Sequence, residues 1–187
     1  MKVLQTILLT ITVAVLAFAE GPKKAENFTL QDVNGKKHSL VDYKDAEAIV
    51  VMFIATQCPV SNAYNERMAA LHKDYQEKGI VFLGINSNKQ ESIEEIKGHA
   101  AEHGLTFPIL KDHKNVIADK FSASFTPEIF VLSGGLDILY HGRIDDSQRE
   151  ARVTTKDLRK ALDEILTGRP VTTTETKAFG CTIKRVS

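Results

Sequence analysis

The stretch Ile49–Ser61, IVVMFIATQCPVS, decides how the rest of the chain is interpreted. Its first seven residues are apolar and rich in β-branched side chains, which is typical of a strand buried on both faces of a sheet. Cys58 and Pro59 follow this strand, and a helical pattern of apolar residues begins at once. Proline fits the first turn of a helix, where no backbone N–H is needed. The sequence therefore predicts a cysteine at a strand-to-helix corner.

Cys58 is predicted to be reactive for an electrostatic reason. The unpaired N–H groups and the dipole at a helix N-terminus favour an anion, and the thiolate is the reactive form of cysteine. The alternative is an inert core thiol, but such a cysteine is expected inside the apolar run rather than at its polar end. In a C-x-x-C motif the second cysteine would stand where this chain has Ser61. Cys181 is the only other cysteine.

Strand and helix patterns alternate along the chain on both sides of this corner. A hairpin around Asn34-Gly35 comes first, with strands near residues 28–30 and 38–40. Further strands are predicted from short apolar runs at 80–85, 107–110, 129–132 and 138–142.

Helices are predicted from the apolar spacing at 59–78, 93–104 and 116–121, and after a cap at Thr154 or Thr155. The first of these carries an apolar stripe that is expected to pack in the core: Tyr64, Met68, Leu71 and Tyr75. The order of elements predicts an α/β fold with a mixed central sheet, helices on both faces and an N-terminal β-hairpin.

The N-terminus has the pattern of an export signal. Lys2 is followed by a mostly apolar run, and Ala17-Phe18-Ala19 has the small-x-small form that precedes cleavage. We therefore expect a signal peptide at 1–19, a linker at 20–27, one domain at 28–168 and a tail at 169–187. An uncleaved membrane anchor is the alternative for the first segment. In both cases the mature domain is expected outside the cytoplasm, either periplasmic or secreted.

Charge and side-chain clusters exclude several classes of function. The chain has 24 basic and 24 acidic residues, and losing Lys2 with the signal leaves a net charge near −1. Without a basic excess or stripe, no nucleic-acid partner is predicted. His99 and His103 have metal-ligand spacing on a helix, but no third ligand is evident, and a solvated helix face is the expectation. Asp145-Asp146 lack the spaced ligands of a calcium loop and are expected to solvate a loop. No metal or cofactor is predicted.

The order of elements, with Cys58 at the first strand-to-helix corner, resembles the thioredoxin-like superfamily. It is most similar to the exported redoxins of the alkyl hydroperoxide reductase and thiol-specific antioxidant type, over about Phe28 to Leu166. The motifs that carry the resemblance are IATQCPVS at 54–61, FTPEI at 125–129, and Gly134-Gly135 with Gly142 in a closing hairpin.

The resemblance implies a substrate site around the cysteine. Pro127 is expected to follow a cis peptide bond and to face the thiol, since cis bonds are a proline phenomenon. Thr126, Pro59 and Gln57 are expected to line the substrate site. Glu128 is a candidate proton acceptor beside the thiol.

Two departures from the family patterns favour disulfide exchange over peroxide reduction. The second cysteine of C-x-x-C is missing, and peroxiredoxins carry P-x-x-x-[TS]-x-x-C, whereas this chain has Val51 and Ala55 at the Pro and Thr/Ser positions. Arg143 in the closing hairpin is the candidate for the arginine that orients a peroxide in that family.

The resemblance implies a thiol oxidoreductase in which Cys58 attacks a disulfide or a peroxide and a second thiol resolves the product. Ser61 is expected to donate a hydroxyl hydrogen bond to the thiolate. Cys181 is the candidate resolving cysteine, carried by a mobile tail. The alternatives are a permanent Cys58–Cys181 disulfide, and a Cys181 that is free or linked to another molecule.

The implied partners are a protein thiol or disulfide, or a peroxide, together with an external thiol reductant. Membrane contact is expected only through an uncleaved signal anchor. Two other functions remain as alternatives: a non-catalytic binding domain, which Ser61 favours, and a copper-handling redoxin, for which the cysteine pair at the corner is missing.

Overall fold

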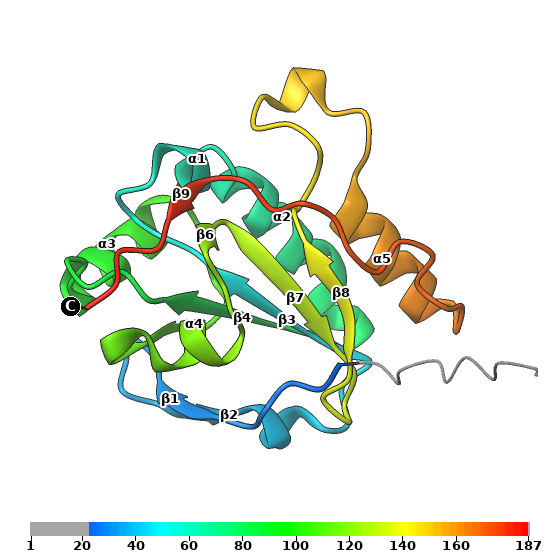
Figure 1. Cartoon of the computed structure of the whole chain (residues 1–187), viewed down its shortest axis with the longest axis horizontal. Helices are drawn as coiled ribbons and strands as arrows, with labels where there is room; N and C mark the ends of the chain where they lie inside the picture. Colours follow the sequence, from blue (N-terminus) through cyan, green and yellow to red (C-terminus); the bar gives the residue numbers. More distant parts are fainter. Residues whose placement is uncertain (1–22, 187) are drawn as a thin grey trace, which may run out of the picture.

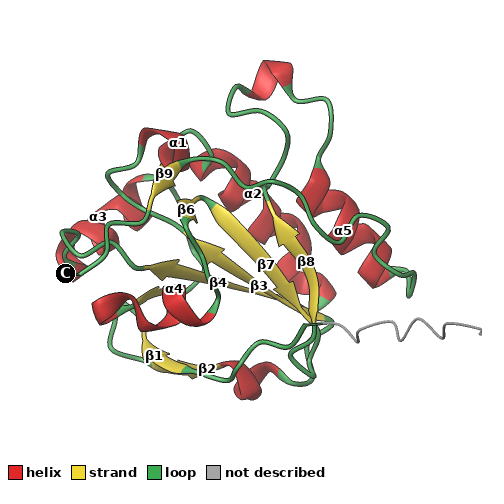
Figure 2. Cartoon of the chain, viewed as in Figure 1, coloured by secondary structure: helices red, strands yellow, loops and turns green. Residues whose placement is uncertain are grey.

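The computed structural model describes residues 23–186 (Figure 1), so the predicted signal peptide lies outside the described residues. A five-stranded mixed sheet forms the centre, in the order β5-β4-β3-β7-β8 (Figure 2). Three strands run parallel: β3 (Ala48–Phe53), β4 (Ile80–Asn86) and β5 (Ile109–Lys111). Strand β7 (Glu128–Leu132) is antiparallel to β3, and β8 (Ile138–Gly142) is antiparallel to β7.

The central strand β3 is buried along its whole length and divides the core in two. Because successive side chains of a strand point to opposite faces, Val50 and Met52 pack in one cluster, while Val51 and Phe53 pack in the other. Each such fully buried side chain contributes about 1.5–3 kcal/mol of transfer free energy. The apolar run in the sequence is continuous because both faces of β3 pack against an apolar cluster.

Helices cover both faces of the sheet, as predicted. The first cluster is completed by apolar residues from α2 (Asn65–Tyr75), α3 (Ile93–Glu102) and α5 (Asp157–Leu166). The second cluster is completed by α4 (Val116–Lys120) and by Phe28 and Leu40, which flank the hairpin of β1 (Thr29–Gln31) and β2 (Lys37–Ser39). The predicted α/β class, mixed sheet and N-terminal hairpin are therefore confirmed.

The helix predicted at 59–78 is interrupted. It consists of a single turn, α1 (Pro59–Asn62), then α2, then a short 3-10 turn at Gln76–Lys78. The break places Tyr64 at the N-cap of α2, where its ring is buried and its hydroxyl donates to Asp145 Oδ1 at 3.0 Å. The predicted apolar stripe is confirmed, because all four of its residues are buried.

Helix α5 begins later than predicted. Its N-cap is Lys156, not Thr154 or Thr155. The reason is that Thr154 is engaged elsewhere, since both its backbone N–H and its hydroxyl donate to the Asp146 carboxylate. The preceding loop is held by this contact and contains a 3-10 turn at Glu150–Arg152.

The C-terminal segment is packed against the domain, and the mobility expected of it stays a prediction. Figure 1 shows it crossing from α5 over the ends of the strands towards α3. His141 of β8 donates its N–H to the Thr174 carbonyl and accepts from the Thr176 N–H, both at 2.9 Å. Further on, β9 (Cys181–Thr182) pairs antiparallel with β6 (Phe125–Thr126) in a separate two-stranded sheet.

The other edge of the central sheet also has a neighbour. Beyond β1, the Val33 N–H donates to the carbonyl of Ile109 in β5 at 3.0 Å, and Asp32 forms a bridge with Leu110. Among residues 23–186, no helix has the length and apolar character needed to cross a membrane.

Candidate active site

Cys58 lies at the junction of β3 and α1, as predicted. It is the N-cap of α1, with Pro59 in the first helical turn. Its side chain is 3% exposed. The Ser61 backbone N–H donates to its sulfur at 3.2 Å, and the thiol donates to the Thr126 carbonyl at 3.3 Å. The peptide bond between Thr126 and Pro127 is cis, so this part of the expectation is confirmed.

Ser61 contributes through its backbone rather than its hydroxyl. The Ser61 Oγ accepts the backbone N–H of Ala55 at 3.2 Å, which fixes the end of the loop to the start of α1. The hydrogen bond to Cys58 Sγ comes from the Ser61 backbone N–H. The expected hydroxyl donor is therefore wrong in this structure, because the side chain points to the strand end.

Cys181 lies directly beside Cys58. In the β6–β9 pair, Cys181 is opposite Thr126. The two side chains lie close enough for each to shift the pKa of the other. Both cysteines are free thiols in this structure. The two residues that the sequence leaves 123 positions apart are thus brought together at one site.

Gly180 permits this approach. Its φ of +156° is unfavourable for other residues, and a Cβ there would lie 2.1 Å from the Thr126 carbonyl oxygen. Gly142 has the same role at the other end of the tail, where a Cβ would lie 2.0 Å from Thr176 Oγ1. These two glycines allow the tail to lie against the sheet and the cis-proline loop.

The two thiols have opposite pKa shifts. Burial raises the pKa of Cys58, but the neighbouring Cys181 and the hydrogen bond from the Ser61 N–H outweigh it and bring that pKa below its usual range. Burial and the neighbouring Cys58 raise the pKa of Cys181. Cys58 is therefore the group that ionises first, and Cys181 is the group that keeps its proton.

Glu91 holds the loop in front of Cys58, a role that no pattern in the sequence indicates. Its carboxylate is 1% exposed and accepts the backbone N–H groups of Thr56 at 2.8 Å and Gln57 at 3.0 Å. The side-chain amides of Asn86 and Asn88 also donate to it. Burial raises the pKa of Glu91, but these four donors outweigh it and lower that pKa. A buried carboxylate with this many donors stays ionised and fixes the loop.

Gln57 extends away from the thiol. Its side-chain amide lies 3.5 Å from Glu95 Oε1 on α3, in an exposed position. Its expected contact with a substrate stays a prediction.

Buried polar atoms without a partner gather around the thiol. Within residues 23–186 they are Thr56 Oγ1, Asn62 Oδ1 and Thr126 Oγ1. Thr56 and Asn62 border the Cys58 loop, and Thr126 contacts the cysteine itself. Since buried polar groups normally have a hydrogen-bond partner, this part of the molecule has unused capacity to bind polar groups.

Other residues singled out in the sequence have partners of their own. The Glu128 carboxylate accepts the N–H groups of Ser124 and Phe125 and contacts His141 Nε2 at 2.7 Å, so it holds the loop that leads to Pro127. The Arg143 guanidinium pairs with Asp157 of α5 at 2.7 Å. These contacts give both residues a structural role.

The two histidines of α3 pack against each other, with ring centroids 4.3 Å apart. His99 Nε2 also contacts the side-chain amide of Asn65 at 3.1 Å. In the part of the chain that the structure describes, no group of three or more His, Cys, Asp or Glu side chains is arranged to hold a metal ion.

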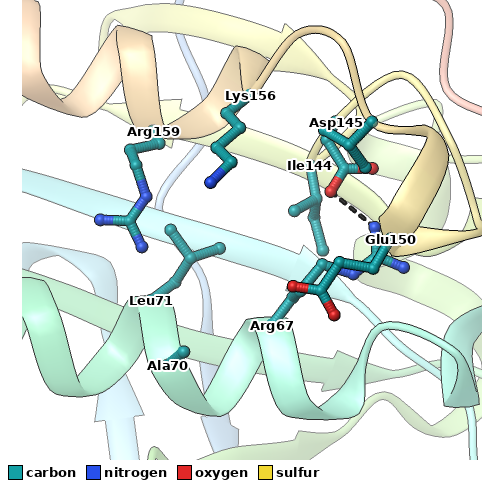
Figure 3. Close-up of a pocket in the computed structure, with 9 residues that line it drawn as sticks. Arg67, Ala70, Leu71, Ile144, Asp145, Glu150, Lys156 and Arg159 are labelled. Atoms are coloured by element: carbon teal, nitrogen blue, oxygen red, sulfur yellow. Dashed lines mark hydrogen bonds and ion pairs between the residues drawn. The ribbon is translucent and has the colours of Figure 1, made fainter.

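Asp145 is buried, and the expectation that it solvates a loop is wrong. It accepts from the Tyr64 hydroxyl and forms an ion pair with Arg67 of α2 at 2.6 Å. Figure 3 shows this pair at one end of a cavity of about 320 Å³, with Lys156 and Arg159 at the other end. The Tyr64 ring packs against Phe179 of the tail, so this cluster supports the surface on which the tail lies.

Comparison with known proteins identifies the family. The model of the AhpC/TSA family matches residues 22–141, which is more than half of the chain. The chain therefore belongs to the AhpC/TSA family.

Individual relatives agree with the fold. An uncharacterized conserved protein from Geobacillus kaustophilus superimposes with a TM-score of 0.82 at 36% identity, over 88% of this chain and 92% of that one. A thiol:disulfide interchange protein of the thioredoxin family from Chlorobium tepidum has a TM-score of 0.66 at 21% identity, over 80% of this chain and 99% of its own. The fold is thus thioredoxin-like, as the resemblance implied.

A curated relative adds a named activity. The thiol-disulfide oxidoreductase ResA from Geobacillus thermodenitrificans is 27% identical over 108 residues, which is 58% of this chain. The match spans 60% of the length of that relative.

Proposed function

We propose that the protein is a thiol-disulfide oxidoreductase in which Cys58 is the nucleophile and Cys181 the resolving cysteine. The observation that carries the proposal is the pair of adjacent free thiols with opposite pKa shifts, Cys58 lowered and Cys181 raised. The names of relatives such as ResA support exchange between disulfides. The export pattern at residues 1–19 supports a site of action outside the cytoplasm.

The proposed reaction consumes one substrate disulfide and two thiols. The Cys58 thiolate attacks one sulfur of the substrate disulfide, forming a mixed disulfide, and the other sulfur leaves as a thiolate that takes up a proton. Cys181 then loses its proton and attacks Cys58 Sγ, which forms the Cys58–Cys181 disulfide and releases the second substrate thiol. Two thiols of an external reductant regenerate the pair by the reverse exchange. Substrate reduction is therefore a two-electron step.

The test is a peptide map of the protein under non-reducing conditions, with thiols alkylated at once on isolation. We expect a Cys58–Cys181 peptide that disappears under mild reductant. A link that resists all but strong reductant supports the structural disulfide instead. Two free thiols, with Cys58 alkylated no faster than Cys181, would contradict the catalytic proposal and favour a non-catalytic binding domain.

Reduction of a peroxide is the second candidate. Attack of the Cys58 thiolate on a peroxide oxygen would give a sulfenic acid and an alcohol or water, and Cys181 would then displace water to form the same disulfide. Val51 and Ala55 stand where peroxiredoxins carry Pro and Thr or Ser, and Arg143 is paired with Asp157. We therefore expect the protein to reduce a model disulfide much faster than hydrogen peroxide, as measured by consumption of the reductant.

A further inference from the structure

The tail occupies the approach to the nucleophile. Cys58 is 3% exposed, and the tail residues nearest to it are Cys181 and its neighbours in β9. Strand β6 pairs with β9 and belongs to no other sheet. The surface that the tail now covers is therefore a route by which a protein substrate can reach Cys58 Sγ.

Main-chain hydrogen bonds hold the tail on this surface. Phe125 is opposite Thr182, Thr126 is opposite Cys181, and the Ile183 N–H donates to the Ser124 carbonyl at 3.0 Å. Bonds of this kind require an extended backbone but no particular side chain, as in other cases of strand addition to a sheet edge. The same edge can therefore accept an extended segment from another protein.

Side chains of the tail show what the surface selects. Phe179 packs on the Tyr64 ring, with centroids 6.3 Å apart. Gly180 leaves no room for a Cβ, because the Thr126 carbonyl is too close. Ile183 is buried in the second apolar cluster. Around the cysteine, the surface thus has an aromatic site two positions before, a glycine-only site one position before, and an aliphatic site two positions after.

We propose that Phe179–Ile183 is an internal stand-in for the substrate, and that the same groove receives a cysteine-containing extended segment of a partner protein. The segment it fits has the pattern aromatic–glycine–cysteine–any–aliphatic. This inference rests on the proposed function, since it identifies the substrate of Cys58. The tail and the substrate compete for one groove. The tail leaves the groove when the substrate segment docks. It displaces that segment when Cys181 returns to resolve the mixed disulfide.

Both ends of the tail are held outside the groove. Upstream, Thr176 is fixed by main-chain and hydroxyl contacts at the end of β8. Downstream, the Lys184 N–H donates to Asn88 Oδ1 at 2.7 Å and its carbonyl accepts the Lys89 N–H at 2.9 Å, while Arg185 pairs with Asp119. Release of the segment between these anchors frees Cys181, and the anchors that stay in place return the cysteine to the same position.

The experiment measures attack by Cys58 on activated peptides. The probe is the peptide KAFGCTIKR, which copies residues 177–185, with its cysteine joined to a coloured thiolate leaving group. A matched peptide carries alanine in place of the glycine, and a cysteine derivative with the same leaving group measures the intrinsic reactivity of Cys58. The protein is the full chain with Cys181→Ser, so that only Cys58 reacts.

We expect the glycine peptide to react about tenfold or more faster than the alanine peptide, because a backbone clash is an effective way to exclude a wrong partner. Adding Gly180→Ala to the protein should loosen the tail and accelerate the glycine peptide further. Gly98→Ala is the matched control, since a Cβ there meets nothing within 4 Å and the rate should not change. If Gly180→Ala impairs folding, Ile183→Ser serves as the second tail variant.

If the two peptides react at equal rates while the small cysteine derivative reacts quickly, the proposed groove would be overturned and the proposed function would stay intact. The competition with the tail would be overturned by a glycine peptide that reacts faster than the alanine peptide, but at the same rate with and without the tail substitution. If the small cysteine derivative reacts no faster with Cys58 than it does with free cysteine, the proposed function itself would be contradicted. In the unsubstituted protein, a Cys58–Cys181 link between two copies of the chain would assign the groove to a second tail and overturn the partner segment.

Discussion

At the scale of single residues, the reactivity of Cys58 depends on its contact with Cys181. We expect the alkylation rate of Cys58 to rise with pH and to level off with an apparent pKa below the value of about 8.5 for an unperturbed cysteine. Cys181→Ala removes a neighbouring thiol that lowers the pKa of Cys58, so the apparent pKa should rise. The rate of iodoacetamide labelling against pH measures both values. A midpoint that stays the same or falls in Cys181→Ala would contradict this account.

Glu91 is expected to stabilise the fold by holding the loop before Cys58. Glu91→Gln replaces one acceptor oxygen by a donor that faces a backbone N–H, and we expect a loss of about 1–3 kcal/mol in the free energy of unfolding. Urea unfolding at neutral pH measures it. Glu94→Gln, on the exposed first turn of α3, is the matched control and should leave the free energy nearly unchanged.

The Glu91 contribution also has a defined pH dependence. Because the pKa of Glu91 is lower in the folded protein than in the unfolded chain, its stabilisation is fully present above the unfolded pKa. It is lost as the pH falls through the folded pKa. Glu91→Gln should therefore lose less stability than the unmodified protein between about pH 5 and pH 3. Parallel acid curves for the two proteins would mean that Glu91 does not titrate as described.

The position of Cys58 at the strand-to-helix corner was predicted from the local pattern CPVS at 58–61, and the cis-proline was implied by the family resemblance of FTPEI at 125–129. It did not predict Glu91, which lies 35 positions from Thr56 and looks like any glutamate before a helix. It also assigned Ser61 the wrong donor, since the choice between hydroxyl and backbone depends on a rotamer that no pattern reports.

At the scale of elements, the tail depends on a close approach to β8. Gly142→Ala would place a Cβ 2.0 Å from Thr176 Oγ1 at a φ of +152°, so the tail contact and the strand cannot both persist. We expect a loss of about 1–3 kcal/mol and faster hydrogen exchange at His141 and Thr176. Thermal unfolding and exchange mass spectrometry measure these effects.

Gly98→Ala is again the control, because it sits in open space on α3. It should leave exchange at the tail unchanged and slightly raise stability, since alanine is the better helix former. Unchanged exchange at Thr176 in Gly142→Ala would mean that the tail is not held at β8.

The spacing of apolar residues predicts which side chains are buried better than it predicts where a helix begins and ends. The apolar stripe from Tyr64 to Tyr75 was predicted correctly, yet the helix is broken between α1 and α2. At the break, Tyr64 makes a distant contact with Asp145, which the apolar spacing does not describe. The tail was predicted to be mobile because residues 172–178 include few large apolar side chains, but it is held mostly by hydrogen bonds of its backbone, which composition does not describe.

At the scale of the whole molecule, the fold rests on the two clusters that β3 separates. Phe53 is fully buried, with its ring in edge contact with Phe121 at 5.8 Å and Phe130 at 5.9 Å. Phe53→Ala should lower the free energy of unfolding by about 3–5 kcal/mol. Val41→Ala, at a half-exposed position, is the comparison and should cost far less. A loss below 1 kcal/mol for Phe53→Ala would mean that the second cluster does not stabilise the domain in this way.

The contacts of His141 with Thr174 and Thr176, and of Val33 with Ile109, have a consequence for solubility. A strand at the border of a sheet presents free backbone groups on which another molecule can polymerise. In this protein both borders of the central sheet are shielded by the protein's own chain. A version shortened before Thr172 would expose the backbone groups of His141 at the β8 border, and should self-associate into β-rich aggregates. The segment that carries Cys181 thus also keeps neighbouring molecules apart.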